Sequence, residues 1–240
     1  LDEGERITSI LPVEGYEEGH YIFMATANGT VKKTEMSQFA RQRSVGLRAL
    51  ELEANDWLVG TAVTNGDCDI MLFSSEGKAV RFAEGAVRSM GRTAKGVRGI
   101  RLAEGHRLIS LMVPKEDGEL LTVTENGYGK RTAISDFPIK GRGTKGVIAM
   151  ATTDRNGPLV GAEQVFSGDE MMLISDQGTA VRTSVEEVSL LGRNTQGVRV
   201  IRTRSDEKLV NVSRIAEDDD AVTSAAAATS VEASESDAEE

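Results

Sequence analysis

Short apolar runs that end at a turn glycine recur along the chain. The glycines are Gly29, Gly77, Gly127 and Gly178, which stand 48, 50 and 51 residues apart. Before each glycine the apolar residues occupy both alternating faces, as I-M-L-F-S does at residues 70–74. This pattern is typical of a strand buried between neighbours, and glycine suits the turn because it adopts a positive φ without steric cost. The pattern predicts a β-hairpin in each of four repeats.

Two further patterns share this period. One is an apolar run, with copies at residues 6–13, 57–63, 107–113, 158–165 and 208–215. The other is a hexapeptide with Arg in second place, found as G-R-T-A-K-G at 91–96, G-R-G-T-K-G at 141–146 and G-R-N-T-Q-G at 192–197. Three patterns in one order at one period indicate an internal repeat. We place the repeats near residues 7–57, 58–107, 108–158 and 159–215, within a folded region of residues 1–216.

One repeat contains about four β-rich runs. In the second repeat they are residues 58–63, 70–74, 79–82 and 97–102. Four strands in roughly fifty residues match one blade of a radial array. We therefore predict an all-β fold, a propeller-like β-pinwheel of four-stranded blades. Residues 185–190 have room for a helical turn, and no long amphipathic helix is evident.

Composition bounds the possible classes of protein. The chain has 240 residues, of which 39% are apolar, enough for a real core. Its one cysteine, Cys68, permits no internal disulfide, and no apolar run has the length of a membrane span or a secretory leader. We expect a cytoplasmic protein that contacts no membrane.

The net charge of −10 is concentrated at one end of the chain. Residues 217–240 contain nine acidic residues and no Lys or Arg, which leaves 28 basic and 29 acidic residues in the rest. This segment is rich in Ala and Ser and has no aromatic residue, so we predict a disordered acidic tail. The tail either competes with a polyanion for the basic residues of the body or serves as a solubilising segment.

Basic residues recur at fixed places in the repeat. They stand four positions after the turn glycine, inside the hexapeptide, and two positions after its last glycine. The set comprises Lys33, Arg48, Arg81, Arg92, Lys95, Arg98, Arg131, Arg142, Lys145, Arg182, Arg193 and Arg199. In a radial array such residues form bands, which predicts a basic rim that follows a bent duplex through phosphate contacts. The alternative is that these cations only keep strand edges soluble.

Other chemistries find little support. G-R-G-T-K-G satisfies G-x-G-x-x-G, but the V-I-A-M-A-T-T that follows at 147–153 is strand-like, whereas a nucleotide fingerprint needs a helix there. His20 and His106 have no further ligand at metal-binding spacing. Tyr16, Tyr21 and Tyr128 have no context typical of a nucleophile. We expect no cofactor, no metal and no catalytic residue in this chain.

Three stretches resemble the C-terminal domain of the bacterial DNA gyrase A subunit. They are T-A-N-G-T-V-K-K-T at 26–34, E-N-G-Y-G-K-R-T at 125–132 and G-R-N-T-Q-G-V at 192–198. The resemblance covers roughly residues 1–216. It implies a β-pinwheel whose rim wraps double-stranded DNA, so that the A2B2 holoenzyme introduces negative supercoils. It also implies that the DNA-cutting tyrosine lies in another domain of gyrase A, whereas the ATPase belongs to the partner, gyrase B.

The family's hallmark is a box, Q-R-R-G-G-K-G, in its first blade. Here the matching positions read M-G-R-T-A-K-G at 90–96, K-G-R-G-T-K-G at 140–146 and L-G-R-N-T-Q-G at 191–197. We therefore expect a fragment that lacks the blade with the full box. Alternatives are the corresponding domain of topoisomerase IV, a protein-interaction propeller and, with no convergent polar pocket to support it, a propeller enzyme.

Overall fold

A computed structural model describes residues 7–13, 15–41, 44, 46–115, 117–204 and 206–216. Within these ranges the chain is all-β, with fifteen strands and four short 3-10 turns. The turns are η1 (Met36–Phe39), η2 (Glu84–Ala86), η3 (Ile134–Asp136) and η4 (Val185–Glu187). The last confirms the helical turn expected near 185–190. No helix in these ranges is long and apolar enough to cross a membrane. The predicted acidic tail, 217–240, lies outside the described residues.

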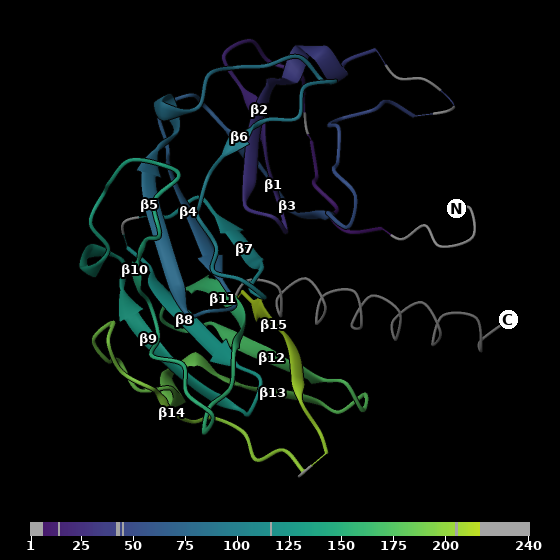
Figure 1. Ribbon diagram of the computed structural model, residues 1–240. Helices are drawn as coiled ribbons and strands as arrows, with labels where there is room; N and C mark the ends of the chain where they lie inside the picture. The colour runs from purple at the N-terminus through teal and green to yellow at the C-terminus, as the bar shows by residue number, and fades with distance from the viewer. Residues whose placement is uncertain are drawn as a thin grey trace, which may run out of the picture.

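The strands form four antiparallel sheets, which we call blades 1 to 4 and which follow one another along an arc in Figure 1. Blade 1 has the strand order β3 (Leu58–Thr64), β1 (Tyr21–Thr26), β2 (Thr30–Glu35), β6 (Val97–Arg98). Blade 2 has the order β7 (Leu108–Met112), β4 (Asp69–Ser74), β5 (Lys78–Ala83), β10 (Val147–Ile148). Blade 3 has the order β11 (Leu159–Val165), β8 (Glu119–Thr124), β9 (Tyr128–Ala133), β14 (Val198–Arg199). Blade 4 contains β15 (Leu209–Ile215), β12 (Glu170–Ser175) and β13 (Ala180–Ser184).

The predicted hairpins are all present, but the prediction of which strands share a blade is wrong. Residues 58–63 were expected to join the hairpin that follows them, whereas β3 pairs with β1 of the preceding hairpin. Residues 97–102 were expected in the same blade, whereas β6 pairs with β2. An apolar run can pair with the hairpin on either side of it, because alternation specifies its faces and not its partner. Blades 1 to 3 therefore each combine strands from two repeats.

The first apolar run, predicted by its likeness to the other four, does not form a strand in the described residues 7–13. Its Ser9 Oγ lies 2.9 Å from Thr61 Oγ1, so the segment contacts β3, the inner strand of blade 1. The other copies pair with the hairpin that precedes them, and no hairpin precedes residue 7 in the described chain.

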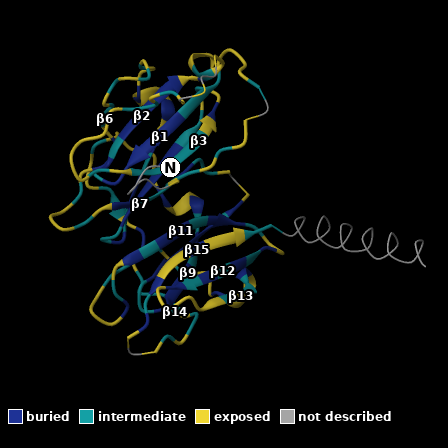
Figure 2. Cartoon of the chain, turned by 90° about the vertical axis from the view of Figure 1, so that its right-hand side faces the viewer, coloured by how far each residue is buried: buried dark blue, intermediate teal, exposed yellow. Residues whose placement is uncertain are grey.

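The hydrophobic core lies between the blades. The inner strands β3, β7, β11 and β15 pack against one another in this order. We call the interface between two neighbouring blades a seam, and side chains of both blades fill it. Phe73 of blade 2 and Leu120 of blade 3, for example, are fully buried in one cluster. In Figure 2 the hairpin β1–β2 is mostly dark blue, whereas β15 at the end of the arc is largely yellow. A blade therefore depends on its neighbours to cover its apolar faces.

The hexapeptides lie in segments that cross from one blade to the preceding one, and we call the segments at 91–101, 141–151 and 192–201 the crossing segments. Each begins with a hexapeptide and continues through β6, β10 or β14, the outer strand of the preceding blade. The last glycine of each hexapeptide has a positive φ. A Cβ at Gly96, Gly146 or Gly197 would lie closer than 3.0 Å to a carbonyl oxygen of β2, β5 or β9. The glycine is required because the crossing backbone lies directly against the blade it joins.

The two ends of the array supply a natural comparison. Gly46 closes the corresponding stretch of the first repeat, and Gly178 is the turn glycine of blade 4. Both have a positive φ, yet a Cβ at either would meet nothing within 4 Å. Among the residues that the structure covers, no blade precedes blade 1 for the stretch at Gly46 to join, and no crossing strand reaches blade 4. The close backbone contacts at Gly96, Gly146 and Gly197 therefore follow from strand exchange between repeats.

We predict that Gly146→Ala destabilises the fold far more than Gly178→Ala. Both changes strain a residue with positive φ, which costs about 1 kcal/mol. Only Gly146→Ala also forces a methyl group onto the backbone of β5, so its loss should reach about 3 kcal/mol or more. Urea unfolding of the two variants measures the difference, and equal losses would show that the crossing segments are loosely packed.

Candidate nucleic-acid interface

The four cations predicted from the strands are ion-paired. Arg81, Arg131 and Arg182 each contact the carboxylate twelve residues earlier, on the other strand of the same hairpin: Asp69, Glu119 and Glu170. Two of them also reach the next blade. Arg81 donates to the carbonyl oxygens of Ile134 (3.3 Å) and Phe137 (3.5 Å), and Arg131 donates to that of Val188 (2.8 Å). Arg81 and Arg131 therefore hold neighbouring blades together, and each of the three arginines has its charge neutralised by an acid. We call these three arginines and Lys33 the seam cations.

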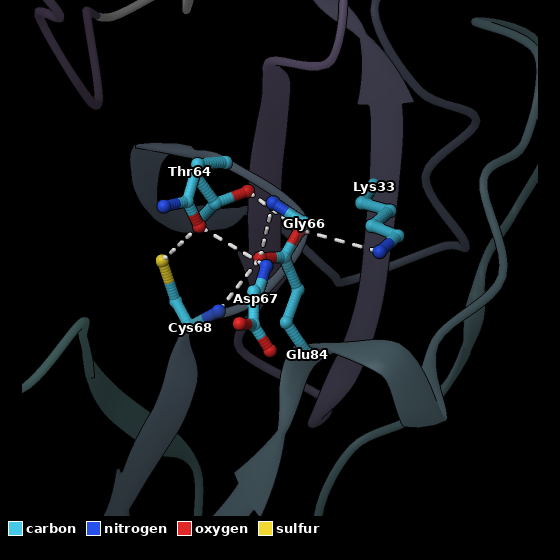
Figure 3. Close-up of polar contacts among 7 residues, drawn as sticks. Lys33, Thr64, Gly66, Asp67, Cys68 and Glu84 are labelled. Carbon is cyan, nitrogen blue, oxygen red and sulfur yellow. Dashed lines mark hydrogen bonds and ion pairs between the residues drawn. The ribbon is translucent and has the colours of Figure 1, made fainter.

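Lys33 completes the set through a different acid. Its Nζ lies 3.3 Å from Oε1 of Glu84, a fully buried carboxylate at the start of η2 (Figure 3). The Thr64 hydroxyl donates to the same carboxylate at 2.7 Å, and the backbone N–H groups of Gly66 and Cys68 donate at 3.0 and 3.4 Å. Glu84 thus ties β2 and β3 of blade 1 to the start of blade 2. A buried charge of this kind is tolerated only because each lone pair has a partner.

A substitution within the repeat explains why Glu84 is needed. Where the other hairpins carry the acid, blade 1 has Tyr21, and Lys33 lies over its ring with Nζ 4.6 Å from the centroid. Where the other repeats carry an apolar residue, the second has Glu84; its counterparts are Met36, Ile134 and Val185. Blade 1 has Tyr21 where the other hairpins have an acid, and Glu84 of the next repeat supplies the acid instead. The charge of Lys33 is therefore still neutralised.

The hexapeptide arginines have a different environment. Arg142 is exposed and donates to the carbonyl oxygens of Ala86 (2.9 Å) and Arg98 (3.1 Å). Arg193 donates to the carbonyl of Ile148 (3.1 Å) and lies 5.9 Å from the centroid of Phe137. Arg92 is half-buried. Carbonyl groups carry no net charge, so the positive charge of these arginines is not neutralised by their partners.

The remaining predicted cations are Arg48, Lys95, Arg98, Lys145 and Arg199, and all five are exposed. Lys95 lies 3.9 Å from Glu51, with both side chains about half exposed, so this pair stabilises the fold little. Arg48 lies before β3, outside the crossing segments. Eight of the twelve predicted residues therefore lie away from the paired seam cations, and seven of these eight are on the crossing segments.

Backbone hydrogen bonds join successive crossing segments. The N–H of Arg101 donates to the carbonyl of Thr144 at 2.8 Å, and that of Gly143 donates to Gly99 at 2.5 Å. The next pair is joined in the same way, by Ala151 N–H to Thr195 carbonyl at 2.9 Å. The three segments thus form a continuous ribbon across the outer strands of blades 1 to 3. We call this ribbon the crossing belt.

Two buried lysines that sequence reasoning missed anchor the belt. The Lys130 ammonium donates to the carbonyls of Gly192 (2.7 Å) and Arg193 (2.5 Å) and to the Thr195 hydroxyl (3.1 Å). In blade 1, Lys32 donates to the carbonyls of Ala49, at 2.6 Å, and Arg92. Burial lowers the pKa of each lysine to about 8, and the nearby hexapeptide arginine contributes to the shift. Both side chains fix a loop that carries an arginine.

The signal for these lysines was present in the sequence. They stand three positions after the turn glycine, where blades 2 and 4 have Val80 and Val181. A lysine in a place that other repeats fill with valine indicates a buried ammonium with dedicated acceptors.

The other chemistries considered from the sequence involve metal ligands, the two histidines and G-R-G-T-K-G. No group of three or more His, Cys, Asp or Glu side chains among them could hold a metal ion. His106 Nδ1 lies 3.1 Å from the Ser75 hydroxyl, and His20 Nδ1 lies 3.8 Å from Glu17. G-R-G-T-K-G is followed by the strand β10, as its sequence predicted, and no helix begins there.

Comparison with known proteins finds a family that matches nearly all of the described chain. The family is described as DNA gyrase C-terminal domain, beta-propeller, and the match covers residues 20–65, 69–115, 118–165 and 169–216. The chain is 56% identical over 217 residues to the DNA gyrase A protein of Escherichia coli (strain K12), a match that covers 90% of this chain and 25% of that protein. The chain thus spans about a quarter of the length of the curated relatives it matches.

Solved structures agree with this match. A structure of the DNA gyrase A C-terminal domain superposes with a TM-score of 0.80 at 29% identity, covering 90% of this chain and 72% of that one. The C-terminal domain of DNA topoisomerase IV superposes with a TM-score of 0.85 at 24% identity, covering 91% and 68%. At that identity the second likeness shows the fold alone.

We predict that Lys130 makes the free energy of unfolding increase with pH in the alkaline range. Its folded-state pKa of about 8 lies below the ordinary 10.5, so the unfolded chain binds the proton more tightly. The free energy of unfolding should therefore rise as the pH rises through 8 toward 10.5, by on the order of 1 kcal/mol for this residue. In the Lys130→Met variant, the free energy of unfolding should rise by that much less over the same pH range.

The measurement is urea unfolding of both proteins at pH 7 and at alkaline pH. Lys115→Met, which removes an exposed lysine outside the belt, is the matched control. If the difference between the original protein and Lys130→Met did not change with pH, the Lys130 ammonium would not be desolvated as described.

Proposed function

This chain belongs to the DNA gyrase C-terminal domain family, and we propose from that premise that it binds duplex DNA and bends it around the crossing belt. Gyrase is a type II topoisomerase, and the family resemblance implies that its DNA-cutting tyrosine and its ATPase lie outside this chain. Its contribution to the enzyme would then be mechanical. By wrapping DNA in one handedness it would present a crossing segment for strand passage, which allows negative supercoils to be introduced.

The observation that carries this proposal is the separation of two classes of cation. The seam cations face acids. On the belt, Arg142 and Arg193 donate to carbonyl groups and Arg199 to a tyrosine hydroxyl, and among the described belt cations only Lys95 meets an acid, at 3.9 Å. A cation that already faces an acid gains little from binding a phosphate. A cation without an acid neutralises the phosphate and so releases the counterions that the DNA held there. We therefore assign the phosphate contacts to one set of eight: Arg48, Arg92, Lys95, Arg98, Arg142, Lys145, Arg193 and Arg199. For Lys33, Arg81, Arg131 and Arg182 we propose a positioning role.

Magnitudes favour many weak contacts. Bending a short duplex through 40 to 90° costs on the order of 1 to 6 kcal/mol, so several phosphate contacts must share the work. The belt repeats one loop on three successive blades, which spreads its cations along the path of a bent duplex. No helix is available to enter the major groove within the described chain, so we expect binding that depends little on base sequence.

The partners of this proposal are duplex DNA, the rest of the gyrase A protein and the gyrase B protein in an A2B2 holoenzyme. The place of action is the cytoplasm, where bacterial chromosomes lie. The folded unit would be residues 1–216, with repeats near the boundaries expected from the sequence. Topoisomerase IV is the related alternative, but the chain is 56% identical to the gyrase A protein of Escherichia coli, whereas the topoisomerase IV structure is 24% identical and shows the fold alone.

A protein-interaction propeller remains the alternative from another class. It predicts that removing belt cations leaves DNA binding unchanged. We predict instead that Arg98→Ala with Lys145→Ala makes the dependence of DNA affinity on salt shallower. Both residues are exposed belt cations. If each neutralises one phosphate, the slope of log affinity against log salt concentration should fall by about 1.8 in magnitude.

The measurement is binding to a linear duplex long enough to follow the belt, across a salt series. Lys115→Ala with Arg204→Ala removes two exposed positive charges from connections outside the belt and serves as the control. An equal change in both double variants would mean that only net charge matters, and the belt would not be the DNA path.

A further inference from the structure

Two arginines converge on one tyrosine at the outer edge of blade 3. The hydroxyl oxygen of Tyr128 accepts a hydrogen bond from Arg199 Nη2 at 2.8 Å and another from Arg155 Nε at 3.2 Å. Both guanidinium groups also lie over the ring, 5.1 and 5.2 Å from its centroid. The tyrosine is buried, whereas both arginines are exposed. Tyr128 is therefore a platform beneath two cationic groups that face solvent.

The backbone fixes both arginines independently. Arg199 lies on β14 and is the register partner of Tyr128 on β9. Arg155 lies on the turn before β11, which is held by the buried Asn156. The Asn156 side chain donates to the carbonyls of Ala151 (2.9 Å) and Gln196 (3.2 Å), so the turn is tied to the crossing belt. The two guanidinium groups are thus held in place before any ligand arrives.

The charges of this cluster are unbalanced. Among the described residues neither Arg155 nor Arg199 is ion-paired with a carboxylate, although like charges held so close repel each other. Glu125, which precedes Tyr128 by three residues, is ion-paired with Lys208 at 2.8 Å. An anion placed between the two guanidinium groups would relieve the repulsion and accept the donors that the tyrosine leaves free.

The cluster occurs once in the described array. In blade 1 the strand position of Arg199 is held by Arg98, whose register partner is Thr30. In blade 2 the corresponding pair is Ile148 and Lys78. The cluster is therefore not a general feature of the repeat, and Arg155 is absent from the set of cations that the repeat pattern predicts.

We propose that Arg155 and Arg199, supported by Tyr128, form a two-arginine clamp for a single phosphate group. Identifying that phosphate as part of the DNA backbone rests on the proposed function, whereas the anion site itself does not. The clamp would fix the register of the duplex on blade 3, because one phosphate is held by two arginines in a set geometry.

The first test is a double-mutant cycle in DNA binding across a salt series. Arg155→Ala and Arg199→Ala should each reduce the salt slope by about 0.9, and the double variant should reduce it by the same amount, because both arginines hold one phosphate. Arg98→Ala combined with Arg199→Ala is the control: Arg98 lacks the tyrosine and the second arginine, so these two residues hold different phosphates and their slope losses should add. Additive losses for Arg155 and Arg199, or an unchanged slope for Arg155→Ala, would overturn the clamp while leaving the belt proposal intact.

The second test needs no DNA. The two arginine donors lower the pKa of the Tyr128 phenol, and a bound anion draws on those donors and adds negative charge. Pyrophosphate should therefore raise the pKa of Tyr128, measured by phenolate absorbance, relative to chloride at equal ionic strength. Tyr128→Phe identifies the signal among the three tyrosines. No shift with pyrophosphate would overturn the clamp whatever the outcome with DNA, and a shift without DNA binding would refute only the proposed function.

Discussion

Each crossing segment approaches the preceding blade so closely that no side chain fits between the two backbones. A Cβ at Gly96, Gly146 or Gly197 would collide with the carbonyl of a neighbouring strand, so a residue without a side chain ends each hexapeptide. That contact lets β6, β10 and β14 complete blades whose hairpins belong to earlier repeats. It also decides where the hexapeptide cations lie, because each loop is carried onto the outer edge of another blade. Strand exchange and the position of the positive charge are thus one feature of the fold.

The seams between blades use charge in the opposite way. Arg81, Arg131 and Arg182 stand opposite an acid on the same hairpin, and Lys33 obtains its acid from the next blade through Glu84. Neutralised cations of this kind add directional contacts to seams that are otherwise apolar. On the belt, Arg142 and Arg193 donate to carbonyl groups, while Lys32 on β2 and Lys130 on β9 fix the belt loops from the blades beneath them. Arginine and lysine therefore hold neighbouring blades together at the seams and supply positive surface charge on the belt.

Much of this fold could be predicted from the sequence, because the repeat contains its own evidence. The hairpins, the turn glycines and the all-β class follow from periodicity, and the structure confirms them. The sharing of strands between blades could not be predicted, since the run at 58–63 is equally compatible with the hairpin on either side. Repetition of Arg81 and Arg131 indicated a common role, but the acids twelve residues earlier show that this role includes ion pairing. Arg155 gave no signal at all, because its importance arises only where a turn and a strand meet at Tyr128.

Native-state amide hydrogen exchange at the crossing strands would measure whether the blades are interlocked. If they are, the amides of β6, β10 and β14 should open with nearly the same free energy as the hairpins they complete. Addition of duplex DNA should slow exchange further in the hexapeptides of the belt and leave the inner strands unchanged. Crossing strands that opened at low free energy while the hairpins stayed protected would contradict this interlocking, because the belt would then lack a fixed shape on which to bend DNA.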